Sequence, residues 1–362
     1  QNGDFSEEGS EEVSNGSFTQ EGSEELANSD FTNGLTSWNG SGYTVVNNQL
    51  IANSTGLFYQ PLSLTANKTY KAEINIESIS QGGVKFYCQG NQSATITTSG
   101  VHTIYIVSGS SNSLVGINPI GTFEAVVNSI SVREVGQDWD LGTGWSIAED
   151  KAISDGSGRI NPTNNSWLSG KTYKFDIEVS DRTAGYFRIQ NPAVSIYYVN
   201  NINSNGTYTY YINTIDANGF VIEAVGFDGS ITNISVKEVG QNWTLGSNIA
   251  IGENKLIGTN ANSSTYQNVG IQVNKTYKIQ FTVLDYSNGN VRFIINGSPN
   301  VVSSDVSSNG EHTLYLNSNS GSNGNLSIQV FNNFNGSVTN ISAIQITDDT
   351  NLPRINYEGF SY

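Results

Sequence analysis

The sequence Asn67-Lys68-Thr69-Tyr70-Lys71 leads into an alternating segment, and close copies of it occur twice more in the chain. The copies read Gly170-Lys171-Thr172-Tyr173-Lys174 and Asn274-Lys275-Thr276-Tyr277-Lys278, and the three tyrosines are 103 and 104 residues apart. A unit of this length is long enough to bury its own core. The repeat therefore indicates a tandem array of complete domains rather than a solenoid of dependent repeats.

Apolar and polar residues alternate over the eight residues that begin at each of these tyrosines. The apolar positions are Tyr70, Ala72, Ile74 and Ile76, then Tyr173, Phe175, Ile177 and Val179, then Tyr277, Ile279, Phe281 and Val283. A period of two predicts an antiparallel strand with one buried face. Further strands are expected at 101–107, 207–213 and 311–317, and at 129–134, 232–238 and 339–345. This density of short strands favours an all-β fold of three tandem jelly-roll β-sandwich domains with a short repetitive N-terminal extension.

The start of each unit is marked by aromatic residues and glycine. On the sequence alone, Trp139 and Trp243 match each other and Phe31, Trp38 matches Trp145, and all four tryptophans are expected in the core, as is Trp167. We therefore divide the chain into acidic repeats at 1–30, β-sandwiches at 31–137, 138–241 and 242–348, and a C-terminal tail or linker at 349–362.

The N-terminal segment has a shorter period of 13 residues, which places Phe5, Phe18 and Phe31 in register, with Val13 and Leu26 between them. Each copy has too little apolar surface to form a core alone. Two interpretations remain: a solvated acidic linker, or a segment ordered against copies of itself in an oligomer with these five side chains turned inward. Because a linker has no need to keep a phenylalanine in register, the oligomer interpretation is favoured.

Charge and composition exclude several classes of partner. The net charge is −16, nine acidic residues precede residue 31, and the first cationic residue is Lys68. An acidic chain without a basic stripe argues against binding to nucleic acid or to an anionic membrane. No apolar stretch approaches a membrane span, and no signal peptide opens the sequence. The absence of methionine predicts a piece of a longer polypeptide or a processed product.

The residues that could carry catalysis are better explained by packing. His102, Tyr208 and His312 occupy one repeat position, and Cys88 is predicted to be buried in a strand, so neither a Cys/His dyad nor a zinc site is indicated. Glu124 and Glu223 match each other and Gln329 in the repeat. A carboxylate that an amide can replace does not indicate a glycosidase pair. No enzyme activity is predicted.

Several motifs together resemble the jelly-roll carbohydrate-binding modules: the opening aromatic residue, glycine and tryptophan, a tyrosine–glutamine pair, the Lys-Thr-Tyr turn and a final Ser-Ile-Ser-Val strand. The 13-residue repeats and the tail Asn351-Leu352-Pro353-Arg354-Ile355-Asn356-Tyr357 resemble segments of bacteriophage tail and virion fibre proteins. The resemblance implies that Tyr59, Gln60, Tyr266 and Gln267 lie on the sheet face that receives a glycan. It implies no cofactor and allows a structural calcium ion, for which the sequence indicates no ligands.

The sequence thus predicts a non-enzymatic virion protein, a tail or capsid fibre or appendage of a bacteriophage, located on the virion or outside the cell. Its expected partners are itself, as a homotrimer formed through the N-terminal repeats, other virion proteins and host-surface glycans. One alternative is a structural spacer or decoration without a ligand. The other is the accessory carbohydrate-binding array of a secreted polysaccharide-degrading enzyme.

Overall fold

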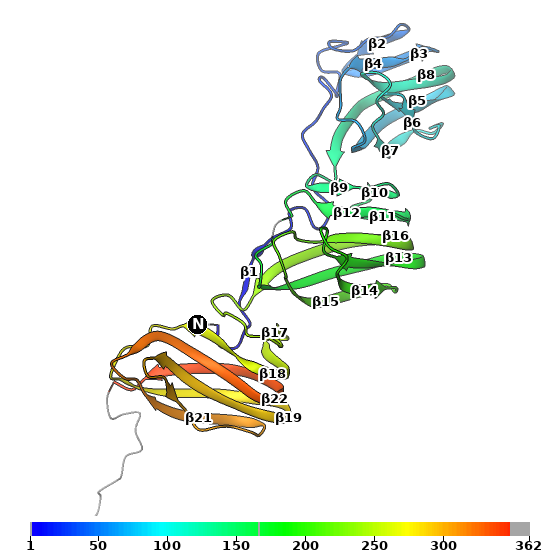
Figure 1. Ribbon diagram of the computed structural model, residues 1–362. Coiled ribbons are helices and arrows are strands. Elements are labelled where there is room, and N and C mark those ends of the chain that lie inside the picture. Colours follow the sequence, from blue (N-terminus) through cyan, green and yellow to red (C-terminus); the bar gives the residue numbers. More distant parts are fainter. Residues whose placement is uncertain (1, 166, 348–362) are drawn as a thin grey trace, which may run out of the picture.

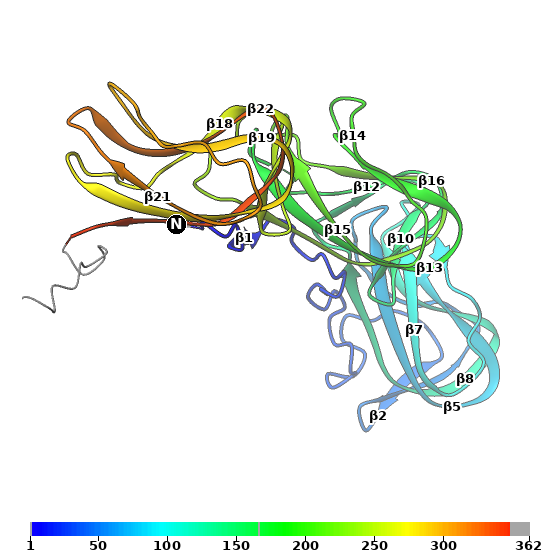
Figure 2. The same cartoon turned by 90° about the horizontal axis from the view of Figure 1, so that it is seen from below.

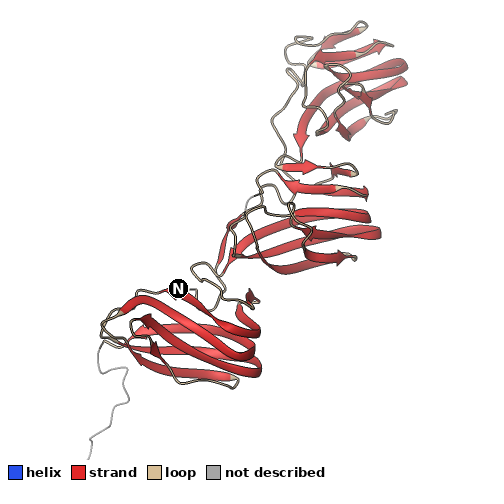
Figure 3. Ribbon diagram, viewed as in Figure 1, coloured by secondary structure: helices blue, strands red, loops and turns tan. Residues whose placement is uncertain are grey.

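The computed structural model describes residues 2–165 and 167–347, so the predicted tail at 349–362 lies outside the described residues. All secondary-structure elements assigned in the described residues are β-strands. They form three lobes in a row (Figures 1 and 3). Seen after a 90° turn, the row is bent, and the first and second domains overlap in projection (Figure 2). The prediction of an all-β chain of jelly-roll domains is confirmed.

The first domain is built on two long antiparallel strands, β5 and β8, with β3 and β4 paired to β8, and β6 and β7 paired to β5. Strand β2 extends the sheet beyond β3. The bounds are β2 (Tyr43–Val46), β3 (Gln49–Ser54), β4 (Phe58–Pro61), β5 (Thr69–Cys88), β6 (Asn91–Gln92), β7 (Gly100–Val107) and β8 (Leu114–Val135).

The other two domains repeat this plan around β13 with β16 and around β19 with β22. The second domain contains β9 (Trp139–Leu141), β10 (Trp145–Ala148), β11 (Lys151–Gly156), β12 (Arg159–Pro162), β13 (Thr172–Gln190), β14 (Tyr197–Ile202), β15 (Gly206–Asn213) and β16 (Val221–Val239). The third contains β17 (Ile249–Gly252), β18 (Lys255–Asn268), β19 (Thr276–Gly297), β20 (Val301–Val302), β21 (Gly310–Asn317) and β22 (Ser322–Gln345).

The long strands bend, and this lets one strand pair with different neighbours along its length. The first half of β13 pairs with β15 and its last residues pair with β14. Between them the register against β16 shifts around Gly185, which has a φ of +63°. A Cβ at this position would lie 2.0 Å from the backbone of Gly226. Glycine therefore permits the bulge that turns the strand.

The predicted alternation is observed, since Tyr70, Ala72, Ile74 and Ile76 are at most 1% exposed. All five tryptophans are buried, as predicted. Their equivalences differ from the sequence alignment, because Trp38, Trp139 and Trp243 make the same contacts in their three domains. Trp145 instead occupies the hairpin position of Tyr43 and Ile249.

The N-terminal residues 2–31 form a strap that runs back along the three domains in reverse order (Figure 1). Its first part lies on the third domain, its middle on the second and its last part on the first. Within it, β1 (Glu8–Glu11) pairs antiparallel with the end of β16. The 13-residue period therefore matches one strap repeat to one domain.

Each repeat docks through the same phenylalanine and asparagine. The phenylalanine ring packs on a tryptophan whose indole N–H donates to the backbone oxygen of the asparagine three residues earlier. The ring centroids are 5.5 Å apart for Phe5 and Trp243, 5.1 Å for Phe18 and Trp139, and 5.7 Å for Phe31 and Trp38. The acceptors are the oxygens of Asn2, Asn15 and Asn28. All three phenylalanines have φ between +57° and +59°, a conformation that a bulky residue keeps only where packing holds it.

These contacts correct the expected role of the N-terminal segment. The five side chains predicted to face other copies are 0–4% exposed and lie in the cores of the chain's own domains: Phe5, Val13, Phe18, Leu26 and Phe31. The prediction that they are ordered and turned inward matches the structure, but their partners are intramolecular. The strap is therefore neither a free linker nor a separate unit at 1–30, because each domain completes its core with one repeat.

Successive domains meet through one repeated contact. The junction glycines Gly136 and Gly240 leave no room for a side chain, since a Cβ there would lie 2.7 Å from Ile147 or 1.9 Å from Ile251 of the next domain. Tyr105 and Tyr211 each pack against the core of the following domain.

Candidate functional site

The predicted glycan-binding pair Tyr59-Gln60 is divided between two faces of β4. Tyr59 is half-buried and points outward, whereas Gln60 is 5% exposed and points inward. Adjacent residues of a strand project to opposite faces, so the two side chains cannot share one binding surface. Gln60 instead holds the strap: its Oε1 accepts from the N–H of Ala27, and its Nε2 donates to the oxygen of the same residue.

The third domain divides its pair in the same way. Tyr266 is 40% exposed on the outer face, and Gln267 is 1% exposed on the inner one. Among the described residues, Gln267 Nε2 has no hydrogen-bond partner. The two glutamines predicted to bind a glycan are thus buried, and the two tyrosines remain as candidates.

Tyr59 belongs to an outward row that crosses the sheet of the first domain, which we call the tyrosine row. Tyr59 is opposite Gly116 on β8, and Gly116 is opposite Tyr87 on β5. Asn39 and Gln92 continue the row at its two ends. A Cβ on Gly116 would lie 2.0 Å from the oxygen of Phe58, so only glycine fits there. Two half-buried rings therefore flank a position without a side chain.

This arrangement is suited to a sugar. Strands lie about 4.8 Å apart, which puts the backbones of Tyr59 and Tyr87 about 10 Å apart across Gly116. Aromatic rings can stack on the C–H face of a pyranose, and amides bond its hydroxyl groups. At one end Asn112 Nδ2 donates to the hydroxyl of Tyr87 and orients that ring. Sequence analysis missed Tyr87, although the buried neighbour Cys88 implied that Tyr87 points outward.

The equivalent rows of the other domains have different chemistry. In the second domain the row contains Asp140, Asn161, Val221, Gln190 and Tyr197. In the third it contains Thr244, Tyr266, Ser327, Ile294 and Val302. In the described residues only the first domain places a tyrosine on each side of a glycine in this row.

Glu223 forms an ion cluster on the second domain. Burial alone would raise the pKa of Glu223, but the guanidinium groups of Arg188 and Arg159 lower it below its ordinary value. Arg188 also lies over the ring of Tyr197, 4.3 Å from its centroid. The strand register aligns Glu223 with Gln329, as predicted. It does not align Glu223 with Glu124. Glu124 is opposite Asn53, and Asp228 is opposite Asp155, so the equivalent of Glu124 in the second domain is Asp228.

The histidines and the cysteine considered in the sequence analysis make packing and backbone contacts. His102 and His312 occupy one repeat position, and the Nε2 of each lies within hydrogen-bond distance of a backbone oxygen four residues earlier. Burial raises the pKa of the Cys88 thiol to about 12. Across 2–165 and 167–347, no group of three or more His, Cys, Asp or Glu residues is placed to hold a metal ion. No helix in the same residues could cross a membrane.

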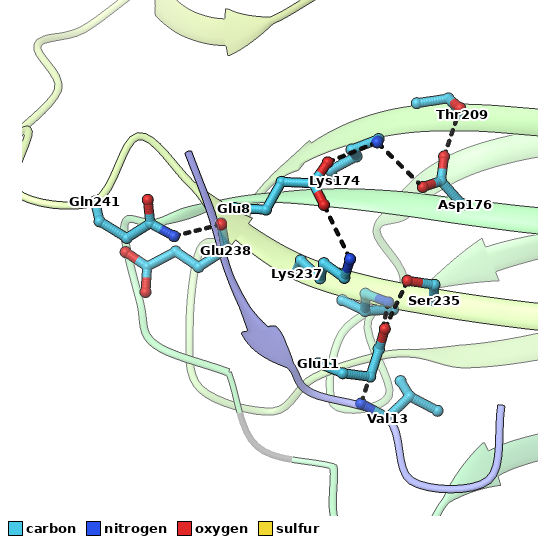
Figure 4. Close-up of polar contacts among 11 residues, drawn as sticks. Glu8, Glu11, Val13, Lys174, Asp176, Thr209, Ser235, Lys237, Glu238 and Gln241 are labelled. Carbon is cyan, nitrogen blue, oxygen red and sulfur yellow. Dashed lines mark hydrogen bonds and ion pairs between the residues drawn. The ribbon is translucent and has the colours of Figure 1, made fainter. Parts of the chain in front are cut away.

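The strap repeats that contain Phe18 and Phe31 each have an acidic half, residues 8–12 or 21–25, that precedes the phenylalanine. Polar contacts hold this acidic half against the domain (Figure 4). Glu8 lies between Lys174 at 2.7 Å and Lys237 at 3.0 Å, and hydrogen bonds from these lysines lower its pKa. Glu11 accepts the N–H of Val236 at 2.7 Å and the hydroxyl of Ser235 at 2.6 Å. In the first domain Glu21 and Glu24 make the corresponding contacts, with hydrogen bonds from Lys71 and Arg133 to Glu21 and from the N–H of Val132 to Glu24.

No protein-family model and no curated protein matches the sequence. Among solved structures, the N-terminal CBM22-1–CBM22-2 tandem domain of Xyn10C from Paenibacillus barcinonensis is 9% identical, with 61% of this chain and 99% of that chain covered and a TM-score of 0.25. A chain from the triple jelly-roll and turret structure of an archaeal virus is 14% identical over 92% of this chain and 90% of that chain, with a TM-score of 0.21. A chain of Sulfolobus turreted icosahedral virus is 12% identical over 91% of each, with a TM-score of 0.20.

These similarities are too weak to support an argument about function. The strand order, the three cores and the strap define the class of this chain, a tandem jelly-roll protein whose domains are joined by an N-terminal strap.

Proposed function

We propose that the protein is a non-enzymatic appendage of a bacteriophage virion that presents carbohydrate-binding-like modules to host-surface glycans. The observation that carries the proposal is the tyrosine row of the first domain, in which Tyr59 and Tyr87 lie on opposite sides of Gly116 on an outer sheet face. The assignment to a virion rests on the resemblance of the 13-residue repeats to phage fibre segments. The protein acts on the virion or outside the cell.

The strap supports this role because it ties three domains into one row. Phe5, Phe18 and Phe31 each fasten a different domain, so the row keeps its order and spacing without a disulfide. Several copies of such a row on one particle bind a glycan surface more tightly than a single site does. Oligomerisation remains part of the proposal, but the buried strap residues do not provide its interface.

A glycan array with the intact protein tests the binding proposal. The Tyr59→Ala and Tyr87→Ala variants should each lower binding about tenfold, corresponding to about 1.4 kcal/mol for a lost stacking contact. Tyr315→Ala is the matched control, because Tyr315 is 52% exposed on the third domain and outside the row. Binding that survives both row variants would place the site elsewhere. An array without hits would favour the spacer function.

A further inference from the structure

The strap covers the three domains unequally. On the first and second domains its contacts extend over an acidic half and a phenylalanine half, from Glu21 to Phe31 and from Glu8 to Phe18. On the third domain the described contacts begin at Asn2 and end at Phe5. The surface of the third domain that corresponds to the acidic half can therefore be compared with two occupied examples.

In the first domain the acidic half pairs with the edge of β8 through an isolated antiparallel bridge between Glu21 and Val135. The N–H groups of Gly22 and Glu25 donate to the oxygens of Glu134 and Val132, each at 2.9 Å. Leu26 follows directly and is 3% exposed in the core. The next peptide group, at Ala27, is bonded by the side-chain amide of Gln60. Backbone pairing, an aliphatic side chain and a buried amide thus recognise the segment together.

The third domain has the same three features without the segment. Strand register places Ala343 and Gln345 where Val132 and Glu134 lie in the first domain. Beyond Ile341, whose N–H donates to Gly3, the described residues contain no strand paired to this edge of β22. A cavity of about 400 Å³ opens beside it, and Trp243, Gln267, Leu326, Ile341 and Ala343 are among the residues that line it.

Gln267 indicates what this cavity receives. It is the repeat equivalent of Gln60, it is 1% exposed, and its Nε2 lacks a partner in the described part of the chain. Leaving a buried amide donor unpaired is unfavourable, because its hydrogen bond to water is lost without replacement. In the first domain the same amide bonds a peptide group of the strap, so a peptide is the ligand that matches it.

We propose that this groove of the third domain binds an extended peptide with the chemistry of the acidic half of the strap repeat, Glu-Gly-Ser-Glu-Glu followed by Leu or Val. The peptide adds to the β22 edge, its aliphatic side chain enters the cavity, and the following peptide group pairs with Gln267. This is recognition by strand addition, with a pocket that selects one side chain.

One difference predicts how binding depends on salt. The cations that hold the first glutamate in the other domains are Lys71 with Arg133 and Lys174 with Lys237. The third domain keeps Lys278 but has Ile344, which is 51% exposed, at the position of Arg133 and Lys237. Binding should therefore rest on the backbone and the aliphatic residue, and salt should weaken it little.

The test fuses the proposed peptide to the N-terminus of the full chain. The seven residues Gln-Glu-Gly-Ser-Glu-Glu-Leu, which repeat Gln20 to Leu26, are placed directly before Gln1, so that the added leucine precedes Val13 by one 13-residue period. The hydrogen exchange of the Ala343 amide is then measured. This amide is the equivalent of the Val132 amide, whose N–H donates to the carboxylate of Glu24 in the first domain. The exchange of Ala343 should slow at least about tenfold, because the tether gives the segment a high local concentration.

The matched control is the same extension with aspartate in place of the leucine, which leaves all 362 residues unchanged and should give little protection. A Gln267→Leu variant should also lose most of the protection, while exchange in the first domain stays as it was. Equal protection by both extensions, or by neither, would overturn the proposal. Protection of Ala343 by an oligosaccharide but not by the leucine extension would also overturn it and would identify the groove as a sugar site.

Discussion

Removing one strap phenylalanine is the most direct test of the architecture. In a Phe18→Ala variant the ring that packs 5.1 Å from Trp139 is lost from a site that is 1% exposed. Truncation of a buried phenylalanine costs about 3–5 kcal/mol, of which about 0.5–1.5 kcal/mol belongs to the aromatic pair itself. Alanine keeps the φ of +58°, so no backbone strain is relieved.

The expected result is local opening of the middle of the strap. The amide of Ile234 donates to Gly16 and reports directly on docking. Its hydrogen exchange should accelerate roughly 100- to 4,000-fold, the range that corresponds to the expected loss of docking free energy. A Phe18→Gly variant should be no worse than Phe18→Ala, because glycine relieves about 1–2 kcal/mol of strain at positive φ.

The same molecule contains its own controls. The amides of Ile130 and Ile341 donate to the outer strap repeats, at Ser29 and Gly3, and their exchange should be unchanged. Thr19→Ala, at an exposed neighbour of Phe18, should have no effect. If the exchange of Ile234 in Phe18→Ala matched that of the unmodified protein, the strap would not be held by its phenylalanines and the reasoning would fail.

Three other predictions follow from the strap and the junctions. Gly16→Ala should destabilise strap docking by about 1–3 kcal/mol, because its Cβ would lie 1.9 Å from a backbone oxygen of β16; an unchanged melting temperature would contradict this. Lysine hydrogen bonds lower the pKa of Glu8 and Glu21 from 4.5, so the stabilisation by these carboxylates is complete above that value and is lost as the pH falls through the lower folded-state values. The difference in unfolding free energy between the protein and its Glu8→Gln/Glu21→Gln variant is about 0.2–1 kcal/mol per ion pair at neutral pH and should shrink as the pH falls below 4.5, until it disappears when both carboxylates are protonated; a difference that stays constant over this range would not be electrostatic. Tyr211→Ala should broaden the distance distribution in small-angle scattering by loosening the junction of the second and third domains, whereas Tyr315→Ala, at the exposed equivalent, should not; equal effects would show that Tyr211 does not hold the junction.

The sequence by itself determined the number of domains, their strand character and the burial of the tryptophans and of the apolar positions in the alternating strands. These properties depend on patterns within a few residues, such as the alternation after Tyr70, or on a repeat that recurs at a fixed interval. The same reasoning identified Phe5, Phe18 and Phe31 as inward-facing, because a register kept over three copies has a packing cause. It also assigned the histidines to one structural position, which the strand register confirms.

Only the tertiary structure decided what the buried residues pack against and which outward residues come together. The indole of Trp139 bonds a strap residue 124 positions earlier, and no local pattern encodes that the strap returns along the chain's own domains instead of meeting another copy. Tyr59 and Tyr87 meet across Gly116 because two separate strands pair with β8 in a particular register. The local pattern of apolar and polar residues predicts whether a strand position is buried. The path of the whole chain decides which side chains it contacts.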